Sequence, residues 1–428
     1  MKKSKLGEVL SISSMSVIPQ AGITYKLYSL PSFDDGQEPE TAGSETIQSN
    51  KYVVPTRCIL FNKLNVRFKR IWRINNNIPN KLCSTEFLPL VINEDLIDYQ
   101  YCYYLLASDY LTNYLCGINS NTSGSHKRIN PDILLSVDVA LPTLNEQKRI
   151  GSMLANLDRK IEINRAINHN LEAIAKQLYD YWFVQFDFPN TEGKPYKSSG
   201  GKMVWNEKLK REIPEEWHCG NLFEIATFTN GLACQKFRPK DGEVPLPVIK
   251  IREMHDGISS DTEEVSPNIP ESVKVYNGDV LFSWSASLEV MLWACGLGGL
   301  NQHIFKVTSA NDFPKSFYYF QLLNYVDVFK KMAEARKTTM GHITQDHLQQ
   351  STIAIPDNKD IVDKFEKRIS PIFAQMVKLQ EEIQQLSKQR DAFLPLLMNG
   401  QVSVNYDLIF LCSPKFSLLW YVTKIIIR

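Results

Sequence analysis

An internal repeat is the feature that most constrains how this chain can fold. Three pairs of segments match in the same order along the chain: 58–65 with 279–286, 101–111 with 317–326, and 128–142 with 342–356. In the last pair, Ile129 corresponds to Ile343 and the motif VALP corresponds to IAIP. Self-similarity on this scale predicts two copies of one structural plan. Each copy would be about 200 residues long, the size of a domain with an added element.

Each copy begins with a mixed stretch and ends with a long helical pattern. The mixed stretches contain short β-branched and aromatic runs, such as RCILFNKL and VPLPVIKI, which Gly, Pro and Asn interrupt. The helical patterns place apolar residues at alternating steps of four and three, and the two series coincide at an offset of about 215 residues. A heptad pattern of this length predicts that the helices pack on each other, whereas two independent amphipathic helices would each lie on their own domain. The predicted seam is Ile150, Leu154, Leu157, Ile161, Asn164, Asn168, Leu171 and Leu178 in the first helix and Phe365, Ile369, Ile372, Met376, Leu379, Ile383, Leu386 and Phe393 in the second.

Two amides, Asn164 and Asn168, occupy seam positions that would ordinarily be apolar. If the helices pair antiparallel, the pattern places these amides opposite apolar residues and Arg390. A polar seam residue lowers stability but fixes register and partner choice, so the helix would act as a spacer of set length. Alternatively, the amides face solvent where the two helices diverge. Each helix would be about 50 Å long at about 1.5 Å per residue.

Two prolines bear on the second helix. Pro371 lies at an outer position of the heptad pattern and is expected to kink the helix or to shift its start, because proline removes a backbone donor. Pro395 is expected to end the helix.

A basic stretch in the first copy is a candidate surface for nucleic acid. No Asp or Glu occurs between Glu45 and Glu86, a region that contains many Lys and Arg residues. Lys and Arg contact phosphates, whereas Asn and Arg can also read base edges. A run of charge can equally be an ordinary solvated face. The densest part, NKLNVRFKRIWR, supplies the candidates Lys63, Asn65, Arg67, Lys69 and Arg70.

Two corresponding polar loops are a second candidate contact surface. Each loop ends the mixed part of its copy, and a feature that occurs in both copies is more informative than either loop alone. A further segment, LNQHIFKV, lies beside an aromatic strand and could hold base-reading residues or form an ordinary turn. The candidates are Ser125, His126, Lys127 and Arg128 in the first loop, Lys337, Thr338, Thr339 and His342 in the second, and Asn301, Gln302 and His303 in the further segment.

The sequence lacks the motifs that common enzyme classes need. It contains no GxxxxGK[ST] loop, no Gly-rich nucleotide fingerprint, no HExxH, no EF-hand ligand series and no GxSxG. The spacing of His342 and His347 does not place them on one helical face as metal ligands. The eight cysteines include no CxxC pair, which argues against zinc and disulfides and favours reduced cytoplasmic thiols. A binding protein is therefore favoured over an enzyme.

Charge and hydropathy are those of a globular protein without a membrane segment. Apolar residues make up 43% of the chain and charged residues 22%, and the net charge is +1. Any affinity for nucleic acid must therefore come from local patches. The start, MKKSKLGEVLSISS, lacks the apolar core of a secretory signal. The final segment is apolar, but Pro414, Lys415 and Lys424 interrupt it, so it is expected to be an atypical tail and not a membrane anchor.

This duplicated plan, a mixed domain followed by a long helix, resembles the specificity (S) subunit of type I restriction-modification systems. The segment LPTLNEQKRIGSMLANLDRKIEINRAINHNLEAIAKQLYDYWFVQFD (141–187) is similar to the central helical region of that family. The segments GDVLFSWSASLEVMLW and LNQHIFKV (278–307) are similar to a second target-recognition domain. LQEEIQQLSKQRDAFLPLLMNGQV (379–402) is similar to the closing helix. The resemblance covers about residues 5–405.

The resemblance implies a mixed α/β fold with two target-recognition domains in a pseudo-twofold arrangement, joined by two long antiparallel coiled-coil helices. Each domain would read one half of a split DNA target, and the length of the helices would set the unread gap. The expected divisions are target-recognition domain 1 at 1–143, the central spacer helix at 144–187, a linker at 188–213, target-recognition domain 2 at 214–357, the C-terminal spacer helix at 358–402 and the atypical hydrophobic tail at 403–428.

The resemblance also implies the partners of the chain. A non-catalytic cytoplasmic subunit of this kind would bind double-stranded DNA, two methyltransferase (modification) subunits and restriction subunits. S-adenosylmethionine, ATP and Mg would bind to those partners, and this chain would hold no metal or cofactor. The competing hypothesis is a coiled-coil scaffold for protein interaction without DNA specificity, which would show no salt-sensitive binding to a duplex. By region, the resemblance adds Lys236, Arg238, Lys250, Arg252 and Trp284 to the candidate DNA contacts.

Overall fold

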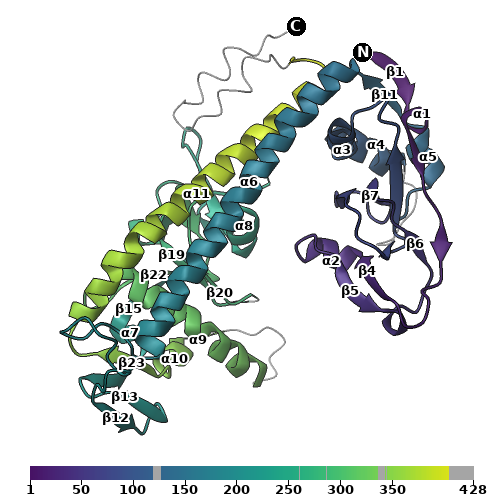
Figure 1. Cartoon of the computed structure of the whole chain (residues 1–428). Helices are drawn as coiled ribbons and strands as arrows, with labels where there is room; N and C mark the ends of the chain where they lie inside the picture. Colours follow the sequence, from purple (N-terminus) through teal and green to yellow (C-terminus); the bar gives the residue numbers. More distant parts are fainter. Residues whose placement is uncertain (119–126, 260, 286, 336–342, 344, 404–428) are drawn as a thin grey trace. The chain divides into compact units, whose positions relative to one another are not determined.

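The computed structural model describes residues 1–118, 127–259, 261–285, 287–335, 343 and 345–403. It divides into two compact units (Figure 1). Unit 1 comprises Met1–Arg159 with Leu386–Arg428, and unit 2 comprises Lys160–Gln385. Each unit contains one mixed domain and a segment of each of the two long helices. The predicted contact residues that lie outside the described residues are Ser125, His126, Lys337, Thr338, Thr339 and His342, and most of the tail lies outside them as well.

Mixed domain 1, the first 143 residues of unit 1, is built on two β-sheets. An aromatic core around Tyr28, Trp72 and Phe87 joins them. Strand β7 contributes to both faces of its sheet, because Cys58 and Leu60 enter this core while Ile59 and Phe61 pack on the opposite side. The first sheet is antiparallel in the order β2-β10-β7-β8, formed by Leu10–Ile12, Phe87–Ile92, Arg57–Asn62 and Ile71–Asn75. The second has the order β3-β6-β9-β4-β5, formed by Ser16–Val17, Lys51–Val53, Lys81–Cys83, Thr24–Tyr28 and Glu40–Gly43.

Helices cover the opposite face of the first sheet in unit 1. Their apolar residues, Leu105 and Leu111 among them, pack with Ile59 and Leu90 of the sheet in one core. The strand pair β1 (Lys2–Lys5) and β11 (Asp138–Leu141) lies beside this core. The helices on this face are α1 (Leu6–Val9), α3 (Tyr99–Leu106), α4 (Asp109–Ile118) and α5 (Pro131–Leu135). Helix α2 (Leu30–Asp34) instead packs against the aromatic core between the two sheets, and a 3-10 turn η1 lies at Ser44–Thr46.

Mixed domain 2 repeats this plan within unit 2. Its antiparallel sheet has the corresponding order β15-β22-β19-β20, formed by Ala226–Asn230, Ile304–Ser309, Val280–Ser283 and Glu289–Leu292. Its second sheet has the order β17-β16-β21-β18, formed by Glu264–Val265, Leu246–Ile249, Gly298–Leu300 and Lys274–Val275. The remaining elements are β14 (Trp217–Gly220), α7 (Leu222–Ile225), η4 (Cys234–Lys236), α8 (Ile251–Asp256), η5 (Glu271–Val273), α9 (Lys315–Ala335), α10 (Gln345–Gln349) and β23 (Ile353–Pro356).

The registers of the strands confirm the repeat that the sequence predicted. Phe61 of β7 pairs with Leu88, and its counterpart Phe282 of β19 pairs with Phe305. Each mixed domain also contains one parallel strand pair in its second sheet, β4 with β9 in domain 1 and β16 with β21 in domain 2. The fold is therefore a mixed α/β repeat, with each copy followed by a long helix.

The two long helices are α6 (Leu144–Tyr179), followed by a π-helical turn η3 (Asp180–Val184), and α11 (Asp360–Met398). A capping box begins α6, because Thr143 Oγ1 accepts from the Glu146 amide while the Glu146 carboxylate accepts from the Thr143 amide. In unit 1, the start of α6 shares a core with the end of α11. In unit 2, the end of α6 shares a core with the start of α11. The segments in both units therefore run antiparallel (Figure 1).

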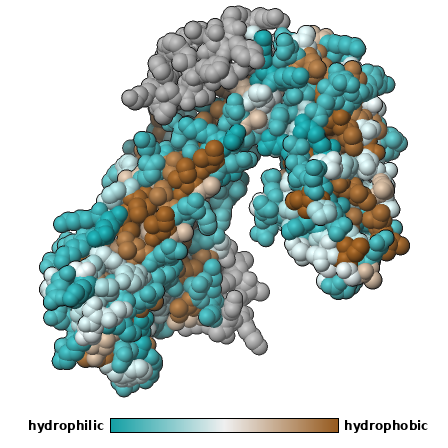
Figure 2. Space-filling view, viewed as in Figure 1, coloured by the Kyte–Doolittle hydropathy of each residue, from teal (hydrophilic) through white to brown (hydrophobic). Residues whose placement is uncertain are grey.

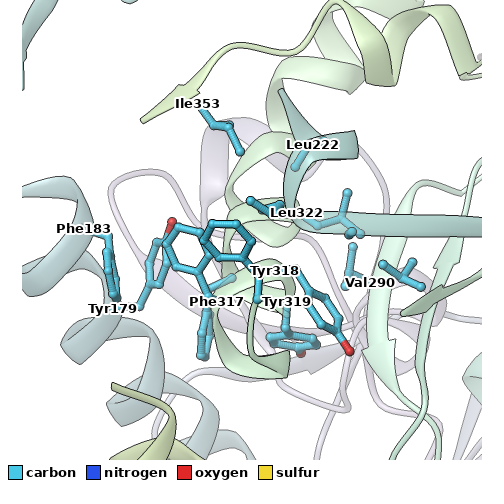
Figure 3. Close-up of a cluster of buried hydrophobic side chains, with 14 of the residues drawn as sticks. Tyr179, Phe183, Leu222, Val290, Phe317, Tyr318, Tyr319, Leu322 and Ile353 are labelled. Carbon is cyan, nitrogen blue, oxygen red and sulfur yellow. The ribbon is translucent and has the colours of Figure 1, made fainter. Parts of the chain in front are cut away.

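Aromatic side chains dominate the core of unit 2. Tyr179 and Phe183, at the end of α6 and in η3, face Phe317 and Tyr319 of α9 in Figure 3. The Phe183 ring lies 5.0 Å from that of Phe317 and 5.0 Å from that of Phe365 in α11. Edge-to-face pairs of this kind contribute about 0.5–1.5 kcal/mol each beyond the burial of their area. The three helices therefore meet in one well-packed cluster.

None of the predicted seam residues is exposed, but the partner of Asn164 differs from the prediction. Asn164 is only 4% exposed, and its Nδ2 donates to Glu382 Oε2 over 2.9 Å. Lys160 forms an ion pair with the same carboxylate. Burial acts to raise the pKa of Glu382, but the hydrogen bonds from Lys160 and Asn164 lower it further than burial raises it. The expectation that only apolar residues and Arg390 would face the amides is therefore wrong, as is solvent exposure for Asn164.

Asn168, the second amide of the seam, is half-buried. Its Oδ1 is inaccessible to solvent and has no hydrogen-bond partner among the residues that the structure describes. An unsatisfied buried acceptor is costly, and its cost would rise if the helix slid into a wholly apolar environment. The two amides thus differ, since one is satisfied by the facing helix and the other is not.

A polar contact joins mixed domain 1 to both long helices in unit 1. Tyr104 of α3 donates to Asp158 Oδ2 over 2.5 Å, and Arg390 Nη1 lies 3.0 Å from Asp158 Oδ1. The repeat places Tyr319 and Phe373 at the positions of Tyr104 and Asp158, and in unit 2 these two rings pack edge to face at 5.1 Å. The same structural position is therefore ionic in one copy and aromatic in the other.

Pro371 neither interrupts α11 nor shifts its start, so the expected shift of the start is wrong. The helix begins at Asp360 and continues through Pro371, whose position is exposed, so water can satisfy the carbonyl that proline leaves without a donor. Pro395 does not end the helix either, because α11 continues to Met398. The end is set by Gly400, whose positive φ of 68° closes a C-terminal turn in which its amide donates to Leu397.

The segment predicted as a linker, 188–213, contains regular structure. Strands β12 (Met203–Asn206) and β13 (Arg211–Pro214) form an antiparallel hairpin. Phe188, near its start, is buried and stacks on Trp217 with ring centroids 5.6 Å apart. The segment is therefore folded onto unit 2.

Candidate nucleic-acid interface

The basic stretch of mixed domain 1 forms the loop between β7 and β8. Asn62, the last residue of β7, shapes this loop because its side chain accepts from the Leu64 amide over 2.9 Å and donates to the Leu64 carbonyl over 2.5 Å. Asn65 follows with a φ of 51°, a left-handed conformation that Asn tolerates better than most residues. Asn62 and Asn65 therefore stabilise the conformation of the loop that carries Lys63 and Arg67.

A second predicted segment lies directly against this loop. The Ile129 amide donates to the Lys63 carbonyl over 3.0 Å, and the Asn65 amide donates to the Lys127 carbonyl over 2.8 Å. Residues that are far apart in the sequence thus form one surface of mixed domain 1. The structure brings together Lys63, Asn65, Arg67, Lys127 and Arg128 among the predicted contacts.

Acidic partners neutralise part of the positive charge on this surface. Lys69 lies 2.5 Å from Asp109, and Arg70 forms two hydrogen bonds of 2.7 Å with Asp34. Arg70 has a raised pKa because of these hydrogen bonds to Asp34. Any phosphate that Lys69 or Arg70 binds must displace these carboxylates or share the cation with them.

Lys63, Arg67 and Arg128, the other cations of this surface, differ from Lys69 and Arg70 in their partners. Among the described residues, Lys63 and Arg67 form no ion pair, and the Arg67 guanidinium lies 4.7 Å from the centre of the Phe68 ring, which is itself 48% exposed. Arg128 bonds the Glu86 carboxylate through Nε at 3.0 Å and Nη2 at 2.8 Å, and these hydrogen bonds raise the pKa of Arg128. Glu86 was not among the predicted contacts, although the repeat aligns it with the predicted residue His303.

Mixed domain 2 builds the same junction with other side chains. The Trp284 amide donates to the His303 carbonyl over 3.3 Å, and the Ile343 amide donates to the Trp284 carbonyl over 3.0 Å. The Trp284 and His303 rings lie 5.5 Å apart, and Trp284 Nε1 donates to Asn230 over 3.2 Å. Asn301 is buried at 7% exposure, so it helps to form the turn more than it offers a contact.

The cations predicted by region in mixed domain 2 lie beside its second sheet. Lys250 bonds Glu263 at 2.6 Å, and Arg252 bonds the buried Glu253 at 2.7 Å. Lys236 and Arg238 are exposed. Their role in DNA contact stays a prediction.

Comparison with known protein families gives one match in each of the two copies. The family profile described as "Type I restriction modification DNA specificity domain" matches residues 1–173 and again residues 214–388. The chain belongs to this family. The specificity subunit of the type I restriction enzyme MjaIX from Methanocaldococcus jannaschii is 24% identical over 76% of this chain and 74% of its own length. The HindI specificity subunit from Haemophilus influenzae is 22% identical over 80% of this chain and 86% of its own length.

A solved structure supports the same fold. The crystal structure of the type I restriction-modification S subunit from M. genitalium has a TM-score of 0.55 and 13% identity, and the match covers 92% of this chain and 95% of that chain. As a type I specificity subunit, this chain recognises DNA targets and assembles with other subunits of its system. No helix within the described residues is long and apolar enough to cross a membrane.

Proposed function

We propose that each mixed domain of this specificity subunit reads one half of a bipartite DNA target. The observation that carries the proposal is the junction built twice, at the end of β7 and at the end of β19, from the same backbone hydrogen bonds and different side chains. Two recognition domains of the same fold can bind different half-sites only if their backbones are alike and the side chains that contact the bases differ. Sequencing of methylated sites in cells with the complete system should reveal two defined half-sites separated by an undefined gap.

We also propose that α6 and α11 together set the length of that gap. The helices have 36 and 39 residues, and Asn164, Lys160 and Glu382 form a polar contact between them. A polar contact inside an apolar seam favours one register, because sliding would leave the Glu382 carboxylate and the amide without partners. A spacer works only if its register is fixed.

The long helices also offer a surface for partner subunits. Ile163, Ile167 and Ile174 of α6 are 48%, 40% and 55% exposed, although α6 already packs on α11. Their spacing places them on one helical face, and Figure 2 shows hydrophobic residues gathered along the long helices. We propose that two methyltransferase subunits bind here and that restriction subunits join the complex.

In this proposal the catalytic chemistry belongs to the partners. S-adenosylmethionine, ATP and Mg would bind to the methyltransferase and restriction subunits, and this chain would act without a cofactor in the cytoplasm. Among the described cysteines, Cys58, Cys83, Cys102 and Cys234 are buried in the core, and burial raises the pKa of Cys58 to about 12. Such thiols are poor nucleophiles, which agrees with a non-catalytic role.

The basic loop of mixed domain 1 gives a first test of DNA contact. Lys69→Ala with Arg70→Ala should weaken duplex binding and reduce the slope of log K against log salt by about one unit for each lost phosphate contact. Asp109→Asn should have the opposite effect. It removes the carboxylate that pairs with Lys69, so Lys69 becomes available to a phosphate and duplex binding should tighten. Titrations with the methyltransferase subunit present at several salt concentrations measure both effects. Unchanged slopes would exclude this loop, and a coiled-coil scaffold without DNA specificity would show no salt-dependent binding at all.

A further inference from the structure

We propose that Arg128, held by Glu86, reads a guanine in the half-site recognised by mixed domain 1, and that His303 and Trp284 occupy the equivalent reading position of mixed domain 2. The inference rests on the proposed reading of a bipartite target and names the residues that distinguish its two halves.

The two reading positions are equivalent in their backbone. In domain 1, the Lys63 amide donates to the Glu86 carbonyl over 2.9 Å, and the Ile129 amide closes the junction on the Lys63 carbonyl over 3.0 Å. In domain 2, the corresponding bonds, described above, join Trp284 to His303 and to the segment before α10. Strand register supports the alignment, because Glu86 and His303 directly precede β10 and β22.

The side chains at these positions differ in chemistry. Domain 1 presents a cation, Lys63, beside the Arg128–Glu86 ion pair, whereas domain 2 presents two rings, those of Trp284 and His303. The backbone hydrogen bonds of the junction are the same in both copies and therefore serve a common structural purpose. The side chains at these positions differ in chemistry, which allows two domains with the same backbone to select different bases.

The geometry of Arg128 suits guanine. Its side chain is 53% exposed while that of Glu86 is only 20% exposed, so an accessible guanidinium is held by a mostly buried carboxylate. Nε and Nη2 bond Glu86, and Nη1 has no hydrogen-bond partner in the described part of the chain. The Nη1–Nη2 edge therefore remains available in a fixed plane. Such an edge matches the O6 and N7 acceptors of guanine in the major groove.

The two rings that the structure describes at this position of domain 2 cannot read a base in this way. The Trp284 indole donates to Asn230 and has no second donor to offer, and His303 Nδ1 is inaccessible and lacks a hydrogen-bond partner among the described residues. His303 Nε2 lies 3.4 Å from Gln302 Nε2, at the partly buried edge of the ring pair. This position therefore selects its base through a ring contact and single hydrogen bonds, without a bidentate fork.

The experiment compares methylated sites in cells that carry the complete restriction-modification system with variants of the full chain. Arg128→Lys removes the planar fork, and Glu86→Gln weakens its support. Both are expected to relax one guanine position of one half-site by at least about tenfold, because a bidentate contact discriminates between bases to that extent. The other half-site should stay unchanged. His303→Ala should relax a position only in that other half-site.

Arg57→Lys is the matched control. Arg57 also forms a two-bond ion pair, with Glu94 at 2.5 and 2.9 Å, but it lies at the opposite end of β7 and both side chains are about equally exposed, at 41% and 45%. It should alter no base preference. If Arg128→Lys and Glu86→Gln lower methylation evenly and keep every base preference, the pair is structural and the inference is wrong. If the unchanged protein directs methylation to sites without two defined half-sites, the proposed bipartite reading itself fails.

Discussion

Replacing Arg390 by alanine is expected to destabilise unit 1 by about 2–3 kcal/mol, because removal of one partner of a partly buried ion pair leaves the Asp158 carboxylate without its cation. The Asp158 side chain is only 13% exposed, and that of Arg390 is 32% exposed, which places the cost below that of a fully buried pair. For a unit of this size, the melting temperature should fall by about 5–10 °C. Calorimetry of the full chain can follow this transition beside that of unit 2.

Two further variants make that result specific. Lys388→Ala changes an exposed residue of the same helix and should cost less than about 0.5 kcal/mol. Asp158→Leu together with Arg390→Leu removes both charges and should cost less than Arg390→Ala alone, as apolar replacement of an ion pair is often neutral. The aromatic contact of Tyr319 with Phe373 at the equivalent position of unit 2 shows that this fold accepts an apolar solution. A double variant less stable than the single variant would contradict this account.

Lengthening both long helices by one heptad is expected to move the preferred gap between half-sites and to leave the half-site sequences unchanged. The insertions would lie between Asn164 and Glu172 in α6 and between Phe373 and Glu382 in α11. These sites keep the hydrogen bond of Asn164 to Glu382 and that of the Tyr319 hydroxyl to Glu172. A heptad adds about 10 Å, close to the rise of three base pairs, and preserves the apolar seam. Methylation at the original gap should fall at least about tenfold, since a factor of ten corresponds to only about 1.4 kcal/mol.

The control for this experiment is an insertion in α6 alone. It shifts one helix against the other and separates Asn164 from Glu382, so methylation should be lost at every gap. Mapping of methylated sites distinguishes the three outcomes directly. If the doubly lengthened protein still used the original gap, the helices would not be the element that measures it.

The repeat and the long helices could be predicted from the sequence because their signals are local and periodic. Apolar heptads identify helices that must bury a seam, and matched segments reveal a duplicated domain without any knowledge of tertiary contacts. Pro371 misled the prediction because the rule against proline in helices assumes that the freed carbonyl cannot find another partner. At an exposed position of a long, well-packed helix, tertiary contacts outweigh that local cost.

The electrostatic details of the candidate site could not be predicted in the same way. Lys69 and Asp109 are 40 residues apart in the sequence, and Arg70 and Asp34 are 36 apart, so no local pattern connects them. The pairing of Asn164 with Glu382 depends on the register between two helices, which the heptad pattern leaves undetermined. Glu86 was not predicted because the search considered positively charged residues only, whereas Glu86 is the carboxylate that orients Arg128.

The division of the chain has a consequence for the order of folding during synthesis. Unit 2 is continuous and lies wholly inside the sequence of unit 1, whose core is completed by Leu397, Met398 and Val402 near the end of α11. A ribosome therefore releases every residue of unit 2 before it releases the last core residues of unit 1. Mixed domain 1 is therefore synthesised first, but part of its apolar surface stays uncovered until mixed domain 2 and the end of α11 have been synthesised.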